Sequence, residues 1–317
     1  MENLPDIQIV ADELAGMRLD QAAARLFPDY SRAKLQQCIR DAQLLIDGRP
    51  AGVRDKVSGG ETLSLSVVET AKVSFEPEKL PLEIVFEDAE VMIVNKPADL
   101  VVHPAAGNYT GTLLNGLLAY CPELEALPRA GIVHRLDKDT SGLMVVAKTP
   151  ATHQSLVMQL QKRTVSRQYD AIVQGVVTAG GTIDAPLGRH PSQRTKRAVS
   201  GASDARTAIT HYRVQKRFRS HSHLRMQLET GRTHQIRVHL AHIGYPILGD
   251  MTYGGRMSYP RGASPELLEC IQQFRRQALH ARILGFIHPV EQEYMEWESA
   301  MPAVMQQLLS LLEQDSG

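Results

Sequence analysis

Ionisable residues gather directly before an apolar run near the middle of the chain. Residues 131–146 read GIVHRLDKDTSGLMVV, and the run that follows the charges, 143–147, has the length of a buried strand. The charged residues are therefore expected in a loop that the sheet anchors. Such a loop can hold Asp137 beside a guanidinium, which would keep the carboxylate ionised and in place as a nucleophile. A solvated turn closed by Ser141 and Gly142 would explain the same residues without chemistry.

Two later segments carry residues that could serve the same chemistry. Residues 167–171 (RQYDA) put Tyr169 at the head of an apolar strand, and residues 231–239 (GRTHQIRVH) put Arg237 within one helical turn of His234. Taken singly, both have ordinary explanations. A tyrosine at the head of a strand is usually part of the core, and an arginine in a basic region usually contacts solvent or phosphate.

The three segments, in this order, resemble the motifs of the RluA family of RNA pseudouridine synthases, and the resemblance covers nearly the whole chain. It implies that Asp137 is the catalytic nucleophile, that Tyr169 lies over the target uracil and that Arg237 is the ionic partner of Asp137. It also implies that Arg135 enters the RNA helix when the target nucleotide is flipped out. The reaction breaks an N-glycosidic bond, turns the uracil and rejoins it through a ring carbon, and Asp137 could attack either the ribose or the uracil ring.

The distribution of charge favours an RNA partner more than the total charge does. Lysine plus arginine equals aspartate plus glutamate at 35 each, which excludes a protein that holds nucleic acid through bulk charge. Residues 186–242, however, contain 12 basic and two acidic residues, a local net of +10, whereas residues 291–317 contain six acids and no base. A neutral total therefore conceals a basic face suited to a phosphate backbone.

Residues 189–197 (RHPSQRTKR) lack apolar periodicity and read as an exposed basic loop. For His234, His239 and His242 a zinc site is the alternative to helix packing or RNA contact, but no cysteine or carboxylate stands at metal-ligand spacing. We therefore expect no metal and no organic cofactor. The residues expected to contact RNA are Arg32, Lys34, Arg135, Arg189, Arg194, Lys196, Arg197, Arg232 and His234.

The fold class expected is α+β, with a small domain before a large one. Residues 16–68 combine two short helices (18–27 and 32–41), an Asp47-Gly48 turn and a strand (62–68), and they resemble the S-four-type RNA-binding domain. Eight basic against six acidic residues would also suit a simple helical cap. Residues 69–81 read as a linker and residues 82–317 as the catalytic domain.

The large domain should contain a mixed, mainly antiparallel sheet with flanking helices, in agreement with the family fold. The expected strands are 84–88, 91–94, 143–147, 168–173, 208–214, 224–228 and 278–287, and the expected helices are 112–120, 152–162, 233–243 and 302–312. Arg237 would then lie on a helix that Val238 and Leu240 anchor to the core.

Three well-separated cysteines, an acidic N-terminus without an apolar core and the absence of long apolar runs predict a cytoplasmic protein. No heptad appears, so we expect a monomer. The resemblance implies 23S rRNA or the assembling large ribosomal subunit as partner, with the helix 69 stem-loop as target. Another 23S or tRNA uridine, a glycosidase using a second carboxylate such as Asp139, and a non-catalytic assembly factor are the alternatives.

Overall fold

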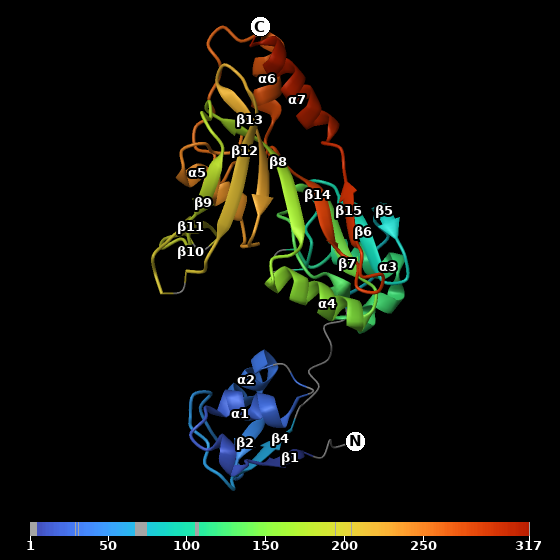
Figure 1. The fold of residues 1–317 in the computed structure, drawn as a ribbon, viewed down its shortest axis with the longest axis vertical. Coiled ribbons are helices and arrows are strands. Elements are labelled where there is room, and N and C mark those ends of the chain that lie inside the picture. Colours follow the sequence, from blue (N-terminus) through green and yellow to red (C-terminus); the bar gives the residue numbers. More distant parts are fainter. Residues whose placement is uncertain are drawn as a thin grey trace. The chain divides into compact units, whose positions relative to one another are not determined.

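The computed structural model describes residues 5–28, 30, 32–66, 75–104, 108–193, 195–203 and 205–316. By its internal contacts the chain divides into two compact units, residues 1–74 and 75–317. Figure 1 follows the chain through both units. Among the described residues, no helix is both long and apolar enough to cross a membrane.

The first unit packs two helices on a small antiparallel sheet. Its strands, in the order β1-β4-β2-β3, are β1 (Asp6–Ile9), β4 (Thr62–Leu65), β2 (Leu44–Ile46) and β3 (Arg49–Pro50), and its helices are α1 (Leu19–Leu26) and α2 (Arg32–Arg40). The turn predicted between β2 and β3 is present, because Asp47 and Gly48 adopt φ values of 47° and 73°. The core of this unit includes Leu19, Leu35 and Leu63, all fully buried. Both expected helices therefore form, and each contributes to one core.

The second unit begins earlier than the sequence indicated. Residues 75–81, expected to be linker, belong to the second unit. Phe75 packs against the main core, and the backbone N–H of Glu78 donates to the Asn115 carbonyl at 3.0 Å. The Asn115 side chain in turn donates to the Glu76 carbonyl at 2.8 Å. The two prolines and mixed charge of this segment concealed these contacts, because backbone hydrogen bonds to another element leave no local periodicity.

A nine-stranded sheet forms the centre of the second unit. Its order is β5-β6-β7-β14-β8-β13-β12-β9, and β15 also pairs with β14. The only parallel pair among the described strands is β7 with β14, so the sheet is mixed and mainly antiparallel, as predicted. The strands are β5 (Glu83–Glu87), β6 (Val91–Lys96), β7 (Ser141–Ala147), β14 (Leu279–Ile287), β8 (Ser166–Gln174), β13 (His221–Leu228), β12 (Ile209–Arg217), β9 (Gly181–Asp184) and β15 (Tyr294–Glu298).

Helices pack on both halves of this sheet (Figure 1). They are α3 (Leu113–Tyr120), α4 (Pro150–Gln161), α5 (Gln235–His242), α6 (Pro265–Gln273) and α7 (Ala303–Gln314), with short 3-10 helices at Pro122–Ala126 and Pro128–Gly131. A further 3-10 helix, Asp12–Leu14, belongs to the first unit. In Figure 1, α4 lies near β7, α5 lies near β9 and β12, and α6 lies beside α7. The largest hydrophobic cluster joins residues of β6, β7, β8, β13 and α5 into one core.

The expected basic loop at 189–197 connects two short strands that the sequence did not indicate; its described residues 190–193, 195 and 196 lie outside any strand and are exposed or partly exposed. Strand β10 (Leu187–Arg189) pairs with β11 (Arg197–Val199) in a separate two-stranded sheet. Both strands have three residues, too few to show an alternating pattern in the sequence. Helix α6 and strand β15 were also missed, although Ser264 and Pro265 form a recognisable helix start, with the Ser264 side chain accepting from the Leu267 N–H at 3.2 Å.

Strand β14 joins the two halves of the sheet. One edge pairs with β8, and the other pairs first with β7, at His280 and Ala281, and then with β15. Gly142 lies where β7 meets β14, at a φ of 119°, and a Cβ at this position would overlap the backbone of Ala281. Only glycine allows this approach, which fixes where the loop ahead of β7 ends.

Gly142→Ala should destabilise the second unit by about 2–4 kcal/mol, because it adds a backbone clash to an unfavourable φ. Thermal and urea unfolding of the full chain measure this loss. Gly201→Ala is the matched control, since Gly201 has no atom within 4 Å of the added methyl group and its φ lies outside the left-handed range. Equal stability of the two variants would show that β7 and β14 can separate at little cost.

Candidate active site

One cavity of about 810 Å³ collects the three segments singled out in the sequence. Asp137 enters it from the loop before β7, Tyr169 from β8 and Arg237 from α5. Gly142 and Lys96 are cross-strand partners in β7 and β6, so the loop leaves the sheet at its centre. The fold therefore brings residues 100 positions apart in the chain to one site.

Arg237 forms the ionic centre of this site. Its Nη1 donates to Asp137 Oδ2 at 2.9 Å, and its Nε and Nη2 donate to the two carboxylate oxygens of Asp250 at 2.7 and 2.9 Å. The guanidinium lies over the Tyr253 ring, 5.0 Å from its centroid. One buried cation thus positions two carboxylates, of which Asp137 was expected and Asp250 was not.

Asp250 is the better satisfied of the two carboxylates. It is fully buried at its side chain, and its Oδ1 also accepts the backbone N–H groups of Thr252 and Tyr253 at 2.9 and 3.0 Å. Burial alone would raise the pKa of Asp250, but the hydrogen bonds and charge of Arg237 outweigh it and lower this pKa. Burial would likewise lower the pKa of Arg237, but its two carboxylates raise it above the ordinary value.

The backbone around Asp137 is anchored on both sides. Leu136 is buried in the main core, and the Thr140 N–H donates to the Asp137 carbonyl at 3.1 Å. Lys96, fully buried, donates to the carbonyls of Lys138, Pro97 and Leu100 at 2.7–2.9 Å. Burial lowers the pKa of Lys96 to about 7, yet each of its three N–H groups has a carbonyl acceptor that only the charged form can fully satisfy. The loop is thereby tied to β6.

A second anchor comes from His134. Its Nε2 accepts the Val145 N–H at 3.1 Å, which requires the neutral ring. Burial, assisted by the charge of Arg167, lowers the pKa of His134 to about 3 and keeps the ring neutral. The histidine of the H-R-L-D segment therefore supports the loop, while Asp137 remains 16% exposed toward the cavity.

The helix that carries Arg237 starts two residues later than predicted. His234 adopts a left-handed conformation with φ 59° and ψ 20°, so α5 begins at Gln235. The Gln235 side chain accepts from the Arg232 N–H and the Thr230 hydroxyl and donates to the Ile209 carbonyl and the Thr210 hydroxyl, all within 2.8–3.0 Å. These bonds fix the helix start on β12 and so fix the place of Arg237 one half-turn later.

His234 lies in the site itself. Its Nε2 is 3.9 Å from Asp137 Oδ1, and its Nδ1 is hydrogen-bonded to the Tyr253 hydroxyl at 2.8 Å. Burial lowers the pKa of His234 despite the nearby carboxylate. His239, by contrast, is a packed helix residue, bonded to Thr210 Oγ1 and to the Ala185 carbonyl at 2.8 and 2.9 Å. Within the described residues, no three His, Cys, Asp or Glu side chains are placed to bind a metal.

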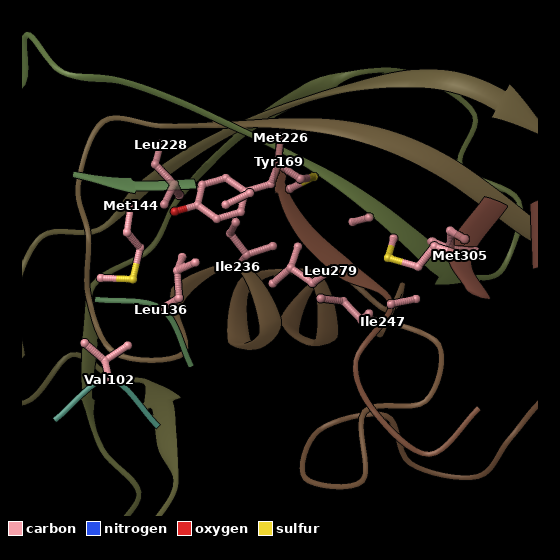
Figure 2. Close-up of a cluster of buried hydrophobic side chains, with 14 of the residues drawn as sticks. Val102, Leu136, Met144, Tyr169, Met226, Leu228, Ile236, Ile247, Leu279 and Met305 are labelled. Atoms are coloured by element: carbon pink, nitrogen blue, oxygen red, sulfur yellow. The ribbon is translucent and has the colours of Figure 1, made fainter. Parts of the chain in front are cut away.

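Tyr169 forms part of the cavity's apolar floor. Figure 2 shows its ring among Leu136, Leu228 and Ile236, with the hydroxyl directed away from Met305. Burial raises the pKa of this phenol, so it is neutral at physiological pH. The next residue, Asp170, points to the opposite face, where it pairs with His223, Arg225 and Arg282.

The residues expected to contact RNA lie in three places. Arg135 and Arg232 are exposed and line the cavity. Arg189 and Arg197 face each other across the β10–β11 hairpin, Lys196 precedes the second strand, and Arg194 lies outside the described residues. On α2, Arg32 pairs with Asp20 at 2.6 Å while remaining 48% exposed, and Lys34 is partly exposed.

The hairpin is connected to the ionic centre. The backbone N–H of Arg197 donates to the Tyr253 hydroxyl at 2.8 Å, and the same hydroxyl bonds to His234. Tyr253 therefore joins a surface segment to the residues that position Asp137. Opposed arginines repel each other across a strand pair, so an anion bound at the hairpin would relieve that repulsion.

Comparisons with known proteins identify the family of this chain. Residues 90–242 match the model of the RNA pseudouridylate synthase family, and residues 17–63 match the S4 domain. A relative from Pseudomonas aeruginosa, named ribosomal large subunit pseudouridine synthase D, is 55% identical over 303 residues, covering 96% of this chain and 94% of the relative. This chain belongs to the RNA pseudouridine synthase family.

Two further members of the pseudouridine synthase family extend the comparison. A relative of the same name from Escherichia coli K12 is 49% identical over 307 residues, covering 96% of this chain and 94% of the relative. The solved structure of human RNA pseudouridylate synthase domain containing 4 is 26% identical, with a TM-score of 0.58 over 73% of this chain and 93% of that one. The expected family and fold, including the first-domain type, are thus confirmed.

Asp250 and Tyr253 are the residues of this synthase that the sequence analysis missed. The segment PILGDMTYG (246–254) has no helical or strand period. Ile247 and Leu248 are buried and place Asp250 beside the core. No local sequence pattern marks Asp250, because its partner Arg237 lies on another element.

Asp250→Asn should lower kcat roughly 100-fold with little change in RNA affinity, because Arg237 loses the charge that orients it toward Asp137. Single-turnover kinetics and stem-loop binding separate the two effects, and thermal unfolding reports any loss of stability. Asp315→Asn is the control, since Asp315 pairs with Arg219 at the far end of the chain. Unchanged kcat in Asp250→Asn would show that Arg237 is positioned without Asp250.

Proposed function

We propose that this protein converts specific uridines of 23S rRNA to pseudouridine, with the helix 69 stem-loop as its target. The observation that carries the proposal is the 2.9 Å contact between Arg237 and Asp137 inside a cavity floored by Tyr169. The relatives named as ribosomal large subunit synthases support the choice of rRNA. The site of action would be the cytoplasm, on rRNA or the assembling large subunit, with the protein as a monomer.

In the proposed reaction Asp137 supplies the carboxylate that makes cleavage of the N-glycosidic bond possible. The electron pair of that bond leaves with the uracil nitrogen, and the freed base turns before a ring carbon bonds to the ribose and loses its proton. Arg237 keeps Asp137 ionised and aimed. Neutral Tyr169 offers a flat surface for the turning base and a hydroxyl for its proton movements.

The target uridine must leave its helix to reach Asp137, because the cavity floor is 4–8% exposed at Leu136, Leu228 and Ile236. Arg135 is exposed, lines the cavity and precedes Asp137 by two residues, and in this proposal it fills the space that the flipped base leaves. Arg189, Lys196, Arg197 and Arg232 would hold flanking phosphates, and Arg32 and Lys34 would do so on the first unit. Such contacts position RNA, and selection then comes from the shape of the loop.

The competing activities make different products. A glycosidase would release uracil, and standard glycoside hydrolysis uses a second carboxylate. Asp250 is the other carboxylate bound to Arg237, but it accepts four hydrogen bonds, which disfavours it as a general acid or base. A synthase for another 23S or tRNA uridine would form pseudouridine elsewhere, and an assembly factor would only bind. Purified protein incubated with uridine-labelled rRNA distinguishes these by pseudouridine, free uracil or binding alone.

Asp137→Asn should abolish pseudouridine formation while RNA affinity and thermal stability stay nearly unchanged, since the substitution keeps the shape and removes the charge and nucleophile. Asp139→Asn, in the same loop, is the control and should retain turnover. Both variants are assayed for pseudouridine on a stem-loop after preparation in a strain lacking wild-type enzyme. Appreciable turnover by Asp137→Asn would remove Asp137 from its proposed role.

A fragment of residues 75–317 keeps the whole main core and all three motifs. It should fold, convert a short stem-loop and bind long rRNA more weakly than the full chain. Its salt dependence of binding should also be shallower, because phosphate contacts on the first unit are lost. Affinity and site choice on full-length rRNA, measured at several salt concentrations, test this division of labour. Equal values for fragment and full chain would leave the first unit without an RNA-binding role.

A further inference from the structure

Arg167 is a buried cation for which the described residues provide no carboxylate. Only two arginines are buried among these residues, Arg167 and Arg237, each 7% exposed. Arg237 binds two carboxylates, whereas Arg167 takes part in no ion pair. Its Nε has no hydrogen-bond partner, and its one side-chain hydrogen bond within the described residues is a long one of 3.4 Å from Nη2 to the Glu229 carbonyl.

An unpaired charge in this position is costly to the fold. Burial lowers the pKa of Arg167 from its ordinary value, but a guanidinium remains charged at any physiological pH. Buried arginines are seldom found without a partner, because removing the charge from water costs several kcal/mol unless an opposite charge replaces the water. A substrate anion could provide that opposite charge.

The guanidinium of Arg167 lines the cavity and lies close to the backbone of another segment. Arg167 precedes Tyr169 by two residues on β8, so both side chains lie on the same face and line the same cavity. Gly231 lines it from the opposite segment, and a Cβ there would lie 2.6 Å from Arg167 Nη1. The glycine of the third motif thus leaves room for the guanidinium.

We propose that Arg167 binds a phosphate of the flipped target nucleotide, which makes it a substrate-positioning residue beside Tyr169. The inference rests on the proposed function, since it needs an RNA nucleotide in the cavity. A phosphate carries its charge before, during and after the reaction, and its oxygens match the fork of a guanidinium. Uracil oxygens, by contrast, gain charge only while the base is detached, and a neutral donor would serve them.

The surroundings of Arg167 favour the backbone over the base. Arg129, Arg135 and Arg232 are exposed and line the same cavity, so the buried Arg167 lies deeper than these three arginines, which can follow a phosphate chain inward. Flipping rotates a nucleotide about its backbone and brings its own phosphates toward the cavity.

The test is a series of stem-loop RNAs, each with one phosphate next to the target uridine replaced by a neutral methylphosphonate. With wild-type protein, one replacement should weaken binding about 10-fold or more, as expected for a hydrogen bond between charged groups. Arg167→Gln should weaken binding of the unmodified RNA by a similar factor and should be insensitive to that replacement. Arg163→Gln is the matched control, because Glu229 already binds Arg163 at 3.1 Å, and it should keep the wild-type sensitivity.

Gly231→Ala gives a second route if Arg167→Gln does not fold. The added methyl group displaces Nη1 without removing the charge, and sensitivity to the same phosphate should fall. If neither variant alters the sensitivity to replacement of any phosphate, the proposed phosphate contact is wrong. It is also wrong if Arg167→Gln lowers only the single-turnover rate, a result that would assign Arg167 to the base. If one phosphate replacement weakens binding to the wild-type protein but not to Arg167→Gln, and the wild-type protein makes no pseudouridine, the proposed function is contradicted while the phosphate contact of Arg167 is supported.

Discussion

The ionic bridge from Asp250 through Arg237 to Asp137 is the interaction on which the site depends. Two carboxylates share one guanidinium, but they share it unequally. Asp250 is buried and takes two guanidinium bonds and two backbone bonds, whereas Asp137 takes one and stays partly open to the cavity. Through the shared guanidinium, the bridge also links α5 to the loop before β7. The carboxylate with unused lone pairs is the one that faces the cavity.

The strand pairings of the large sheet bring the residues of that bridge together. Strand β14 pairs with both β7 and β8, which sets the loop of Asp137 opposite Tyr169. Helix α5 reaches the same place from β12 through Gln235 and the Thr210–His239 hydrogen bonds. Every one of these polar groups is buried and paired, so a small displacement of α5 would leave several unsatisfied. These buried hydrogen bonds hold α5, and with it Arg237, in one position.

The sequence predicted long apolar elements well and polar contacts between distant segments poorly. Strands such as 91–94 and 143–147 are visible as continuous buried runs. The bounds of α5 were predicted to within two residues because its apolar residues, among them Val238 and Leu240, are buried, although in two different hydrophobic clusters. The pairing of Asp137 with Arg237 came from family resemblance, since no local pattern links residues 100 positions apart. Asp250 was missed for the same reason, and the left-handed His234 shifted the start of α5 because a buried Gln235, not a standard cap, begins the helix.

The exclusion of water connects the apolar core to the proposed chemistry. A detached uracil must survive long enough to turn, so water must be kept from the ribose carbon that it left. The floor of the cavity meets this demand with Tyr169, Leu136, Leu228 and Ile236, which belong to the main core of the unit. The same dry surroundings strengthen the attraction between Arg237 and Asp137. Core packing, charge placement and protection of the proposed intermediate thus follow from one arrangement, in which Asp137, the proposed nucleophile, lies at the edge of the hydrophobic core.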